Sequence, residues 1–305
     1  MVKHSATNSS FFAAAILLFG IVTRTYAIDL AQEQRDVDEW YKGRLERLIG
    51  PTGWITLVGL YWLHDGDNTF GRDAHSALVL DHPAMPATLG TFTVQGHAVT
   101  FTAKSGNVVT NDGKPITTIV MQSDATEKPT VLGSGSLEFL VIERVDKIGV
   151  RVRDTEHPAR RAFKGIERYP VSTDWVMDAK FEPYVPNHHI DIVNILGMTE
   201  SMVSPGALVF EKDGKTYRLD AILEAPDDKE LFIMFRDATA ARETYGAGRF
   251  IYIPLPINGR AVLDFNRAYN PPCAFNDFAT CPLPPKQNRL SLRVTAGEKK
   301  YIATK

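Results

Sequence analysis

The sequence predicts an all-β protein in which two antiparallel β modules follow one N-terminal amphipathic helix. From Asp65 onward, turn-forming residues recur every few positions, with short β-prone runs between them. In the second half, Asp213-Gly214 joins two strand-like runs and predicts a clear hairpin. Strands and helices do not alternate along the chain, so the pattern indicates a sandwich or barrel rather than a parallel α/β fold.

The first 27 residues are predicted to be a secretory signal peptide. Lys3 gives a positive start, Phe11 to Val22 form a short apolar run, and "TYA" at Thr25 to Ala27 suits signal peptidase. The apolar run is shorter than the ~20 residues that a membrane-spanning helix needs. The alternative is an uncleaved anchor. We therefore expect a secreted or periplasmic protein that begins at Ile28 and is free of the membrane after cleavage.

Composition and charge narrow the classes of partner. The formal net charge is −2, and removal of Lys3 and Arg24 with the signal makes it −4. A nucleic-acid-binding protein usually shows a basic patch, so no nucleic-acid partner is expected. Dinucleotide and phosphate-loop fingerprints are absent from the sequence, and no cofactor is predicted. The common serine-hydrolase and zinc-protease motifs are also absent, which leaves enzymatic activity open, and the sequence does not indicate an oligomeric state.

Three segments follow the signal. Residues 28–50 form the predicted helix, whose apolar residues recur at helical spacing until Gly50-Pro51 ends it. Residues 51–157 hold the first β module, with runs such as "GTFTVQ", "AVTFTA" and "IGVRVRD". Residues 158–305 hold the second, where "ELFIMFRDA", "RFIYIPLP" and "AVLDFNRAY" are predicted strands and "RLSLRVTAGEKKYIA" supplies the last one.

The first β module resembles a forkhead-associated-type sandwich. "GDNTFGRDAHSALVL" and "NVVTNDGKPI" take the places of that family's Gly-Arg entry and late turn. In that family the Gly-Arg arginine, matched here by Arg72, helps hold a phosphothreonine together with a following Ser-x-x-His. That second motif is absent, because Pro83 to Thr88 reads "PAMPAT". The resemblance therefore implies the fold and argues against phosphopeptide binding, with Arg72 as a surface turn residue.

A second resemblance covers nearly the whole chain, from about Trp40 to Glu298. The strings "GWITLVGLYWL", "FKGIERYPV", "TYGAGRF" and "LDFNRAYNPPCAFNDFATCPLPPKQNRL" are similar to the bacterial and archaeal family known as domain of unknown function 1684. The resemblance implies no activity. It does imply that the segment from Asp264 to Asn288 is the most distinctive part of the family.

Two groups of residues are candidates for a disulfide or a metal site. Cys273 and Cys281 are the only cysteines, and in an exported protein an even cysteine count predicts a disulfide. A metal site is the alternative, although two cysteines do not complete a zinc shell. His188, His189 and Asp191 in "PNHHIDIVN" are weak metal candidates, because on a strand His189 and Asp191 share one face and His188 points the other way.

Polar residues just before the cysteine loop form the candidate ligand site. If "LDFNRAY" is a strand, Arg267 shares a face with Phe265 and Tyr269, an arrangement that suits a carboxylate or phosphate. The alternative is a buried Arg–Asp pair that fixes the loop to the sheet. The predicted ligand-binding residues, which also include two from the turn "TYGAGRF", are Tyr245, Arg249, Asn266, Arg267, Tyr269 and Asn270.

Three functions remain in view. The first is binding of a small polar or anionic molecule in a cleft of the second β module. The second is a hydrolase, in which Asp264 or Glu298 acts as acid or base and Arg249 or Arg267 stabilises an anion. The third is a non-catalytic scaffold or interaction domain, with the apolar segment "GWITLVGLYWL" partly exposed as a contact surface.

Overall fold

A computed structural model describes residues 29–302 and has the predicted all-β fold. One long N-terminal helix precedes three sheets, whose strands pair antiparallel except for one short parallel pair. The predicted signal peptide lies outside the described residues. Within residues 29–302, no helix is long and apolar enough to cross a membrane.

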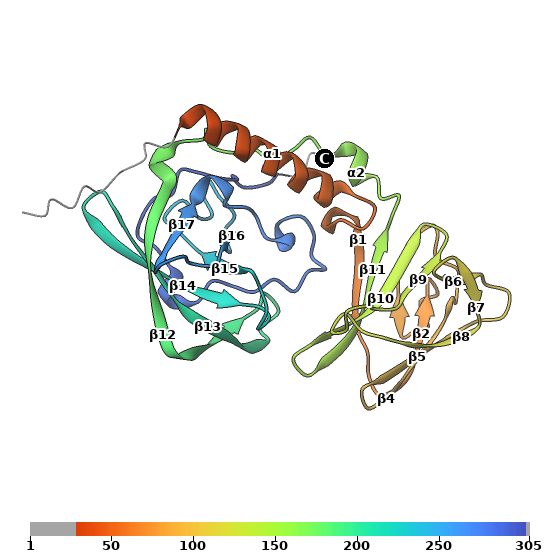
Figure 1. Cartoon of the computed structure of the whole chain (residues 1–305). Coiled ribbons are helices and arrows are strands. Elements are labelled where there is room, and N and C mark those ends of the chain that lie inside the picture. The colour runs from red at the N-terminus through yellow and green to blue at the C-terminus, as the bar shows by residue number, and fades with distance from the viewer. Residues whose placement is uncertain (1–28, 303–305) are drawn as a thin grey trace, which may run out of the picture.

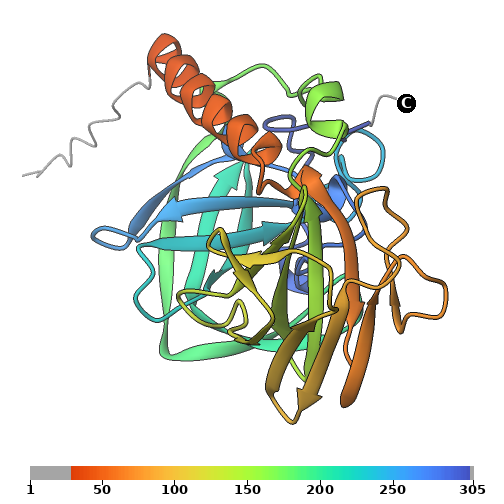
Figure 2. The ribbon, with the colours of Figure 1, turned by 90° about the vertical axis from the view of Figure 1, so that its right-hand side faces the viewer.

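Helix α1 (Leu30–Ile49) confirms the predicted amphipathic helix to within a residue or two at each end. The Asp29 side chain caps its N-terminus by accepting a hydrogen bond from the Ala31 amide at 2.9 Å. Val37 and Leu48 are its fully buried apolar residues, and the Tyr41 hydroxyl donates to the Ile166 carbonyl at 2.5 Å. Helix α1 therefore lies over the sheet formed by the second half of the chain. Its C-terminal end is near the first strand of the first half (Figures 1 and 2).

The first half of the chain forms a sandwich of two sheets. Their inner faces enclose one core in which the rings of Phe70, Phe92, Phe101 and Phe139 lie 4.8 to 6.0 Å apart. One sheet has the order β1 (Leu57–Trp62), β11 (Lys147–Asp154), β10 (Leu137–Arg144), β9 (Val131–Ser134), β6 (Val109–Asn111) and β7 (Lys114–Ile116). The other has the order β3 (Leu78–Val79), β2 (Gly66–Gly71), β4 (Gly90–Gln95), β5 (Ala98–Ala103) and β8 (Thr118–Met121).

The second half forms one strongly curved sheet that nearly closes into a barrel (Figure 1). The predicted Asp213-Gly214 hairpin is present between β13 and β14, with Lys212 paired to Lys215. The inner face of the sheet holds the main apolar core, and part of its outer face is covered by the loop that carries both cysteines. The strand order is β16 (Arg249–Pro254), β15 (Glu230–Phe235), β14 (Lys215–Leu223), β13 (Thr199–Lys212), β12 (Val176–Val193) and β17 (Arg260–Asp264).

The C-terminal segment is not the predicted last strand. Leu290, Leu292, Val294 and Ala296 are buried at alternate positions, as they would be in a strand. Its backbone, however, forms only isolated bridges and no ladder in the described residues. The segment packs into the core of the curved sheet. The alternating apolar residues therefore correctly predicted that its side chains are buried, but not that its backbone lacks strand pairing.

The chain also leaves the predicted strand path at the start of the candidate site. β17 ends at Asp264, whose side chain accepts a hydrogen bond from the Asn266 amide and starts the 3-10 turn η3 (Phe265–Arg267). The two-face pattern expected for "LDFNRAY" therefore does not apply. Other short helices are α2 (Ala159–Ala162), η1 (Trp54–Thr56), η2 (Thr173–Trp175), η4 (Pro272–Ala274) and η5 (Lys286–Asn288).

Candidate functional site

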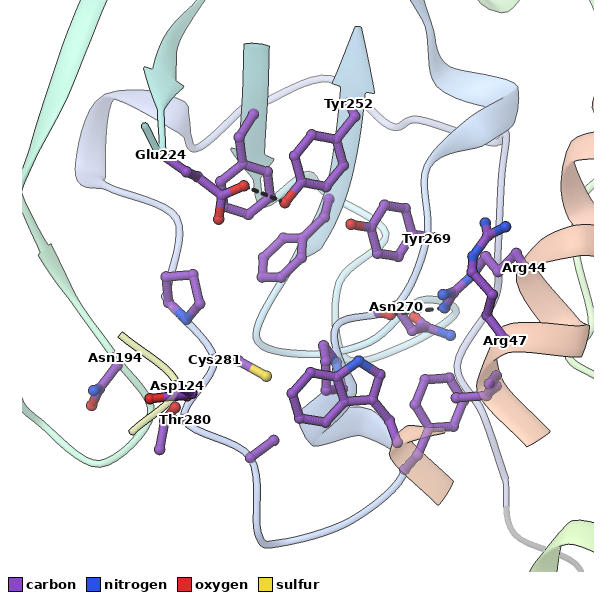
Figure 3. A pocket seen from close by; sticks show the side chains of 18 of the residues that line it. Arg44, Arg47, Asp124, Asn194, Glu224, Tyr252, Tyr269, Asn270, Thr280 and Cys281 are labelled. Carbon is purple, nitrogen blue, oxygen red and sulfur yellow. Dashed lines mark hydrogen bonds between the residues drawn. The ribbon is translucent and has the colours of Figure 1, made fainter. Parts of the chain in front are cut away.

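A cleft of about 1450 Å³ lies between α1, the outer face of the curved sheet and the loop that follows η3 (Figure 3). Asp124 and Arg144 of the sandwich also line it, so both halves of the chain contribute to its wall. Clefts between modules are common ligand sites. The sequence predicted a cleft of the second module, lying between or beside the two modules, and the cleft in the structure lies where the second module meets the first.

Three aromatic rings form one wall of the cleft. Phe232 of β15 is the cross-strand partner of Tyr252 of β16, and their rings stack with centroids 4.8 Å apart. Tyr252 stacks in turn with Tyr269, at a centroid distance of 6.4 Å and an interplanar angle of 15°. Because the rings support each other, the tyrosine hydroxyls are held on a rigid wall.

Glu224 lies at one end of this wall, directly after β14. The Tyr252 hydroxyl donates a hydrogen bond of 2.6 Å to its Oε2 atom. Burial by the surrounding cleft raises the pKa of Glu224, the Tyr252 hydrogen bond opposes that shift, and the charges of Asp228 and Glu200 add to it. Since its side chain still has an exposed surface, Glu224 is a carboxyl group that a ligand can reach.

Arginines from α1 lie at the opposite end of the cleft (Figure 3). Arg44 donates from Nε to Oε1 of Glu298 at 2.5 Å and from Nη2 to the Asn270 carbonyl at 2.9 Å. Its guanidinium carbon lies 4.4 Å from the centroid of the Tyr269 ring. Arg47, one turn further along α1, is exposed and has no hydrogen bond or ion pair within residues 29–302. Arg47 is thus a free positive charge at the cleft.

Arg267 also lines the cleft, and its ion pair with Asp264 leaves its terminal N–H groups free to donate. Its Nε atom donates to Oδ2 of Asp264 at 3.0 Å, and its side chain is 37% exposed. Its two terminal nitrogens form no hydrogen bond with any residue from 29 to 302. The sequence left open whether Arg267 faces a pocket or a carboxylate, and in the structure it does both.

The predicted ligand residues divide into two groups. Arg267, Tyr269 and Asn270 line the cleft together. The other three do not. Tyr245 lies behind the wall, where its hydroxyl donates to the Cys273 carbonyl at 3.0 Å, and Asn266 is buried against Ser172.

Arg249 is the clearest departure from the prediction. On β16 it shares the inner face with Ile251 and Ile253, while Phe250 and Tyr252 face the cleft. Its side chain is 1% exposed, and its guanidinium donates to Asp237 and to backbone carbonyls of the C-terminal segment. Arg249 therefore holds that segment in the core and cannot contact a ligand in the cleft.

The two predicted acid–base candidates are also occupied elsewhere. Asp264 accepts hydrogen bonds from Asn266 and Arg267, and Glu298 is 1% exposed and accepts from Arg44 and the Asn270 amide. Neither side chain lines the cleft. The accessible carboxyl group with a raised pKa is instead Glu224.

Cys273 and Cys281 lie next to each other as free thiols, so the predicted disulfide is not formed in this structure. The Cys273 amide donates to the Cys281 sulfur at 3.1 Å, which gives the thiol pair a structural role without a covalent bond. A hydrogen bond with the Cys273 thiol, together with burial, raises the pKa of Cys281, and the Cys273 amide opposes that rise. Cys281 is 4% exposed and forms part of the cleft wall.

The weak metal candidates lie on β12 and do not line the cleft. His188, His189 and Asp191 are exposed, and the His188 ring stacks on Tyr184 with centroids 3.8 Å apart. Within residues 29–302, no group of three or more His, Cys, Asp or Glu side chains is arranged to hold a metal ion.

Sequence reasoning missed Glu224, Tyr252, Arg44 and Arg47. The alternation in "RFIYIPLP" carried a signal for Tyr252, because a polar-tipped aromatic residue alternating with isoleucines marks the outward face of a strand. For the other three residues no local signal existed, since charged residues on a helix or after a strand are ordinary surface features.

The fold and the cleft define a class of protein: a two-module β protein with a polar, aromatic-lined cleft at the junction of the modules. The chain belongs to the family described as protein of unknown function DUF1684, whose model matches residues 161–299. An uncharacterized protein of Haloarcula marismortui, solved by NMR, is 31% identical over 47% of this chain and 80% of its own, with a TM-score of 0.40.

Two further solved structures match at low similarity. One is the FHA domain of FhaA complexed with the intracellular domain of Rv3910, at 13% identity over 30% of this chain and 96% of that chain, with a TM-score of 0.22. The other is an FHA domain from work on phosphothreonine-dependent interactions, at 17% identity over 34% of this chain and 99% of that chain, with a TM-score of 0.23. No curated protein matched the chain.

Proposed function

We propose that the protein binds a small polar, anionic molecule in the cleft between α1 and the curved sheet. The observation that carries this proposal is a pair of arginine side chains in the cleft lining whose guanidinium groups have unpaired nitrogens within residues 29–302. Arg47 has no partner within residues 29–302, and Arg267 uses only Nε in its ion pair with Asp264. A guanidinium with free terminal nitrogens suits a carboxylate or phosphate.

The remaining lining supports a small-molecule ligand. The volume of about 1450 Å³ is sufficient for a metabolite with its hydration, and the wall combines stacked aromatic rings with a few convergent polar groups. Burial of Arg249 removes one predicted cation from the ligand and leaves Arg267 and Arg47 as its contacts.

A thermal-shift screen of polar and anionic metabolites tests this proposal. A ligand of the cleft should stabilise the wild-type protein, and Arg267→Ala or Arg47→Ala should lower its affinity about five- to tenfold, because each removes one charged contact. Arg72→Ala is the matched control, since Arg72 is an exposed arginine that does not line the cleft. A ligand that stabilises all four proteins equally would exclude the cleft.

A hydrolase is the second candidate, and the state of Glu224 favours it. An accessible carboxyl group with a raised pKa, hydrogen-bonded to a tyrosine, is a common arrangement for an acid or base, whereas the originally predicted Asp264 and Glu298 are occupied in ion pairs. A panel of chromogenic esters and glycosides tests this role. Turnover that Glu224→Gln reduces at least 100-fold would support it, and turnover unchanged in that variant would exclude Glu224.

We also propose that the protein is exported. The support is the N-terminal sequence, in which a short apolar run is followed by "TYA" at Thr25 to Ala27. Expression of the full chain with N-terminal sequencing of the mature product tests the proposal. A product that begins at Ile28 is expected, and an intact N-terminus at Met1 would contradict it.

A further inference from the structure

We propose that the ligand of the cleft is a hydroxylated organic anion, such as a sugar phosphate or a sugar acid. Its anionic group would lie at one of the two free arginines of the lining, Arg47 or Arg267, and its hydroxyl groups would follow the row formed by Glu224, Tyr252 and Tyr269. This inference rests on the proposed function of the cleft and adds the chemical class of the ligand.

The first observation is the row of polar groups on the aromatic wall. Figure 3 shows Glu224, Tyr252 and Tyr269 in sequence along one side of the cleft, with Arg44 beyond Tyr269. The carboxyl group accepts the Tyr252 proton at 2.6 Å and has a second oxygen to accept from a ligand. Hydrogen-bonding groups at successive positions of a rigid wall suit a ligand with several hydroxyls.

The second observation is that the Tyr269 hydroxyl has hydrogen-bonding capacity left for a ligand. Its ring is held by Tyr252, by Trp40 at a centroid distance of 6.3 Å and by Arg44. Burial raises the pKa of Tyr269, and a hydrogen bond with Tyr252 opposes that rise. No hydrogen bond joins the Tyr269 hydroxyl to any other residue from 29 to 302. Since a phenol oxygen can both donate and accept, the Tyr269 hydroxyl can still bond to a ligand.

The third observation is the distance between the two ends. The Tyr252 and Tyr269 ring centroids lie 6.4 Å apart, and the guanidinium carbon of Arg44 lies 4.4 Å from the Tyr269 centroid. The Arg44 guanidinium thus lies no further from the Tyr252 ring than these two distances together, a span that suits a single sugar ring with an attached anionic group. Arg44 itself is paired with Glu298, so the anion would lie at Arg47, one turn along α1 from Arg44, or at Arg267, two residues before Tyr269.

Carboxylates on the sheet side of the cleft and free arginines in its lining favour a ligand that is negatively charged at one end only. Glu200, Glu224 and Glu230 all line the cleft on the sheet side, away from the arginines of α1. A ligand with negative charge at both ends would be repelled there. The neutral hydroxyl groups of a ligand can instead donate hydrogen bonds to these carboxylates.

Titration calorimetry with four defined probes tests the inference: glucose 6-phosphate, glucuronate, inorganic phosphate and glucose. We expect glucose 6-phosphate or glucuronate to bind at least about tenfold more tightly than either phosphate or glucose alone, because two sets of contacts act on one molecule. The comparison of the two sugar anions shows whether the anionic group is a phosphate or a carboxylate.

Two substitutions isolate the hydroxyl-binding row. Tyr269→Phe should weaken the sugar anion about three- to tenfold and leave the affinity for phosphate unchanged, because it removes only a hydroxyl. Glu224→Gln should act in the same direction. Tyr217→Phe is the control, since Tyr217 is a half-buried tyrosine stacked on Phe210 outside the cleft. Because Tyr269→Phe removes only the contact with the exposed Tyr252 hydroxyl, it should keep a melting temperature close to that of the wild type.

The outcomes separate this inference from the proposed function. If phosphate binds and is lost in Arg267→Ala, but the sugar adds no affinity, the hydroxyl row is refuted and the anion site stands. If the sugar anions bind more tightly but Tyr269→Phe and Glu224→Gln leave that advantage intact, the inference is also refuted. If none of the probes binds, both the inference and the anionic end of the proposed function fail.

Discussion

Arg249 donates from Nη2 to Oδ1 of Asp237 at 3.2 Å, and the two side chains are only 1% and 2% exposed. The same guanidinium donates to the carbonyls of Val294, Ala296 and Glu298. Asp237 in turn accepts from the Val294 amide at 2.9 Å. One buried ion pair thus fixes the C-terminal segment, which has no ladder of its own, inside the curved sheet.

Removal of one member of this pair should be strongly destabilising. Asp237→Ala leaves a buried guanidinium without its carboxylate, and we expect the free energy of unfolding to fall by about 3–5 kcal/mol. Urea denaturation followed by tryptophan fluorescence measures the change. Arg293→Ala, which breaks an exposed ion pair with Glu243, should have little effect on the same curve. Equal losses in the two variants would contradict a special role for the buried pair.

The Arg44–Glu298 pair should hold α1 on the curved sheet. Glu298 is 1% exposed, so Arg44→Met leaves a buried carboxylate with only the Asn270 amide as partner, and a loss of about 2–4 kcal/mol is expected. Hydrogen exchange should rise in α1 before it rises in the sheet. Arg47→Met on the same helix should change stability by less than about 0.5 kcal/mol, because Arg47 is exposed and unpaired within residues 29–302. A similar exchange increase in both variants would argue against this anchor.

Glu33 should make stability depend on pH. Burial, followed by the charge of Asp264 and a hydrogen bond to it, raises the pKa of Glu33 from 4.5 to about 7. The folded protein then keeps a proton that the unfolded chain has released, so this contribution to stability is complete below pH 4.5 and is lost as the pH rises to about 7.

Glu33→Gln should remove this part of the pH dependence. After allowance for solvent screening of a partly exposed group, the variant should gain about 1 kcal/mol relative to wild type between pH 5 and pH 8. Chemical denaturation at several pH values measures it. Glu39→Gln, at an exposed position of the same helix, should follow the wild-type curve, and a Glu33→Gln curve that also follows it would refute the assignment.

The cysteine pair should close under oxidising conditions. The Cys273 amide lies 3.1 Å from the Cys281 sulfur, and the export proposed above would bring the pair into an oxidising environment. Incubation with oxidised glutathione should therefore lower the intact mass by two hydrogen atoms, and the bond should add about 2–3 kcal/mol of stability as expected for a short loop. Cys273→Ser is the control. A wild-type mass that stays unchanged, or that increases by one glutathione, would show that the pair does not bridge.

Several elements were predictable because their signals are local. The periodicity of α1, with Asp29 before it and Gly50 after it, depends on neighbouring residues alone. The same holds for the hairpin at Asp213-Gly214, where both residues adopt the positive φ that a tight turn requires, 52° and 70°. The all-β class followed from such turns.

The site was predictable only in part. Arg267, Tyr269 and Asn270 were found because they belong to one polar stretch of sequence. Arg249 was assigned to the ligand because charge in a glycine-containing turn usually marks a surface. Its inward direction depends on β16 pairing with β15, which places Arg249 opposite Phe235 on the core side.

By itself, the sequence determined the helix, the turns, the strand-rich class and the distinctive polar stretch around Arg267. Only the tertiary structure decided which charges are buried and which reach the cleft. The cleft is lined by residues from separate elements, among them Glu224, Tyr252, Tyr269 and Arg47. They line one cleft because α1 lies on the curved sheet and the cysteine loop covers the outer face of that sheet. Burial and pairing of a charge depend on long-range packing, so two arginines that the sequence assigns to the same site can have opposite roles.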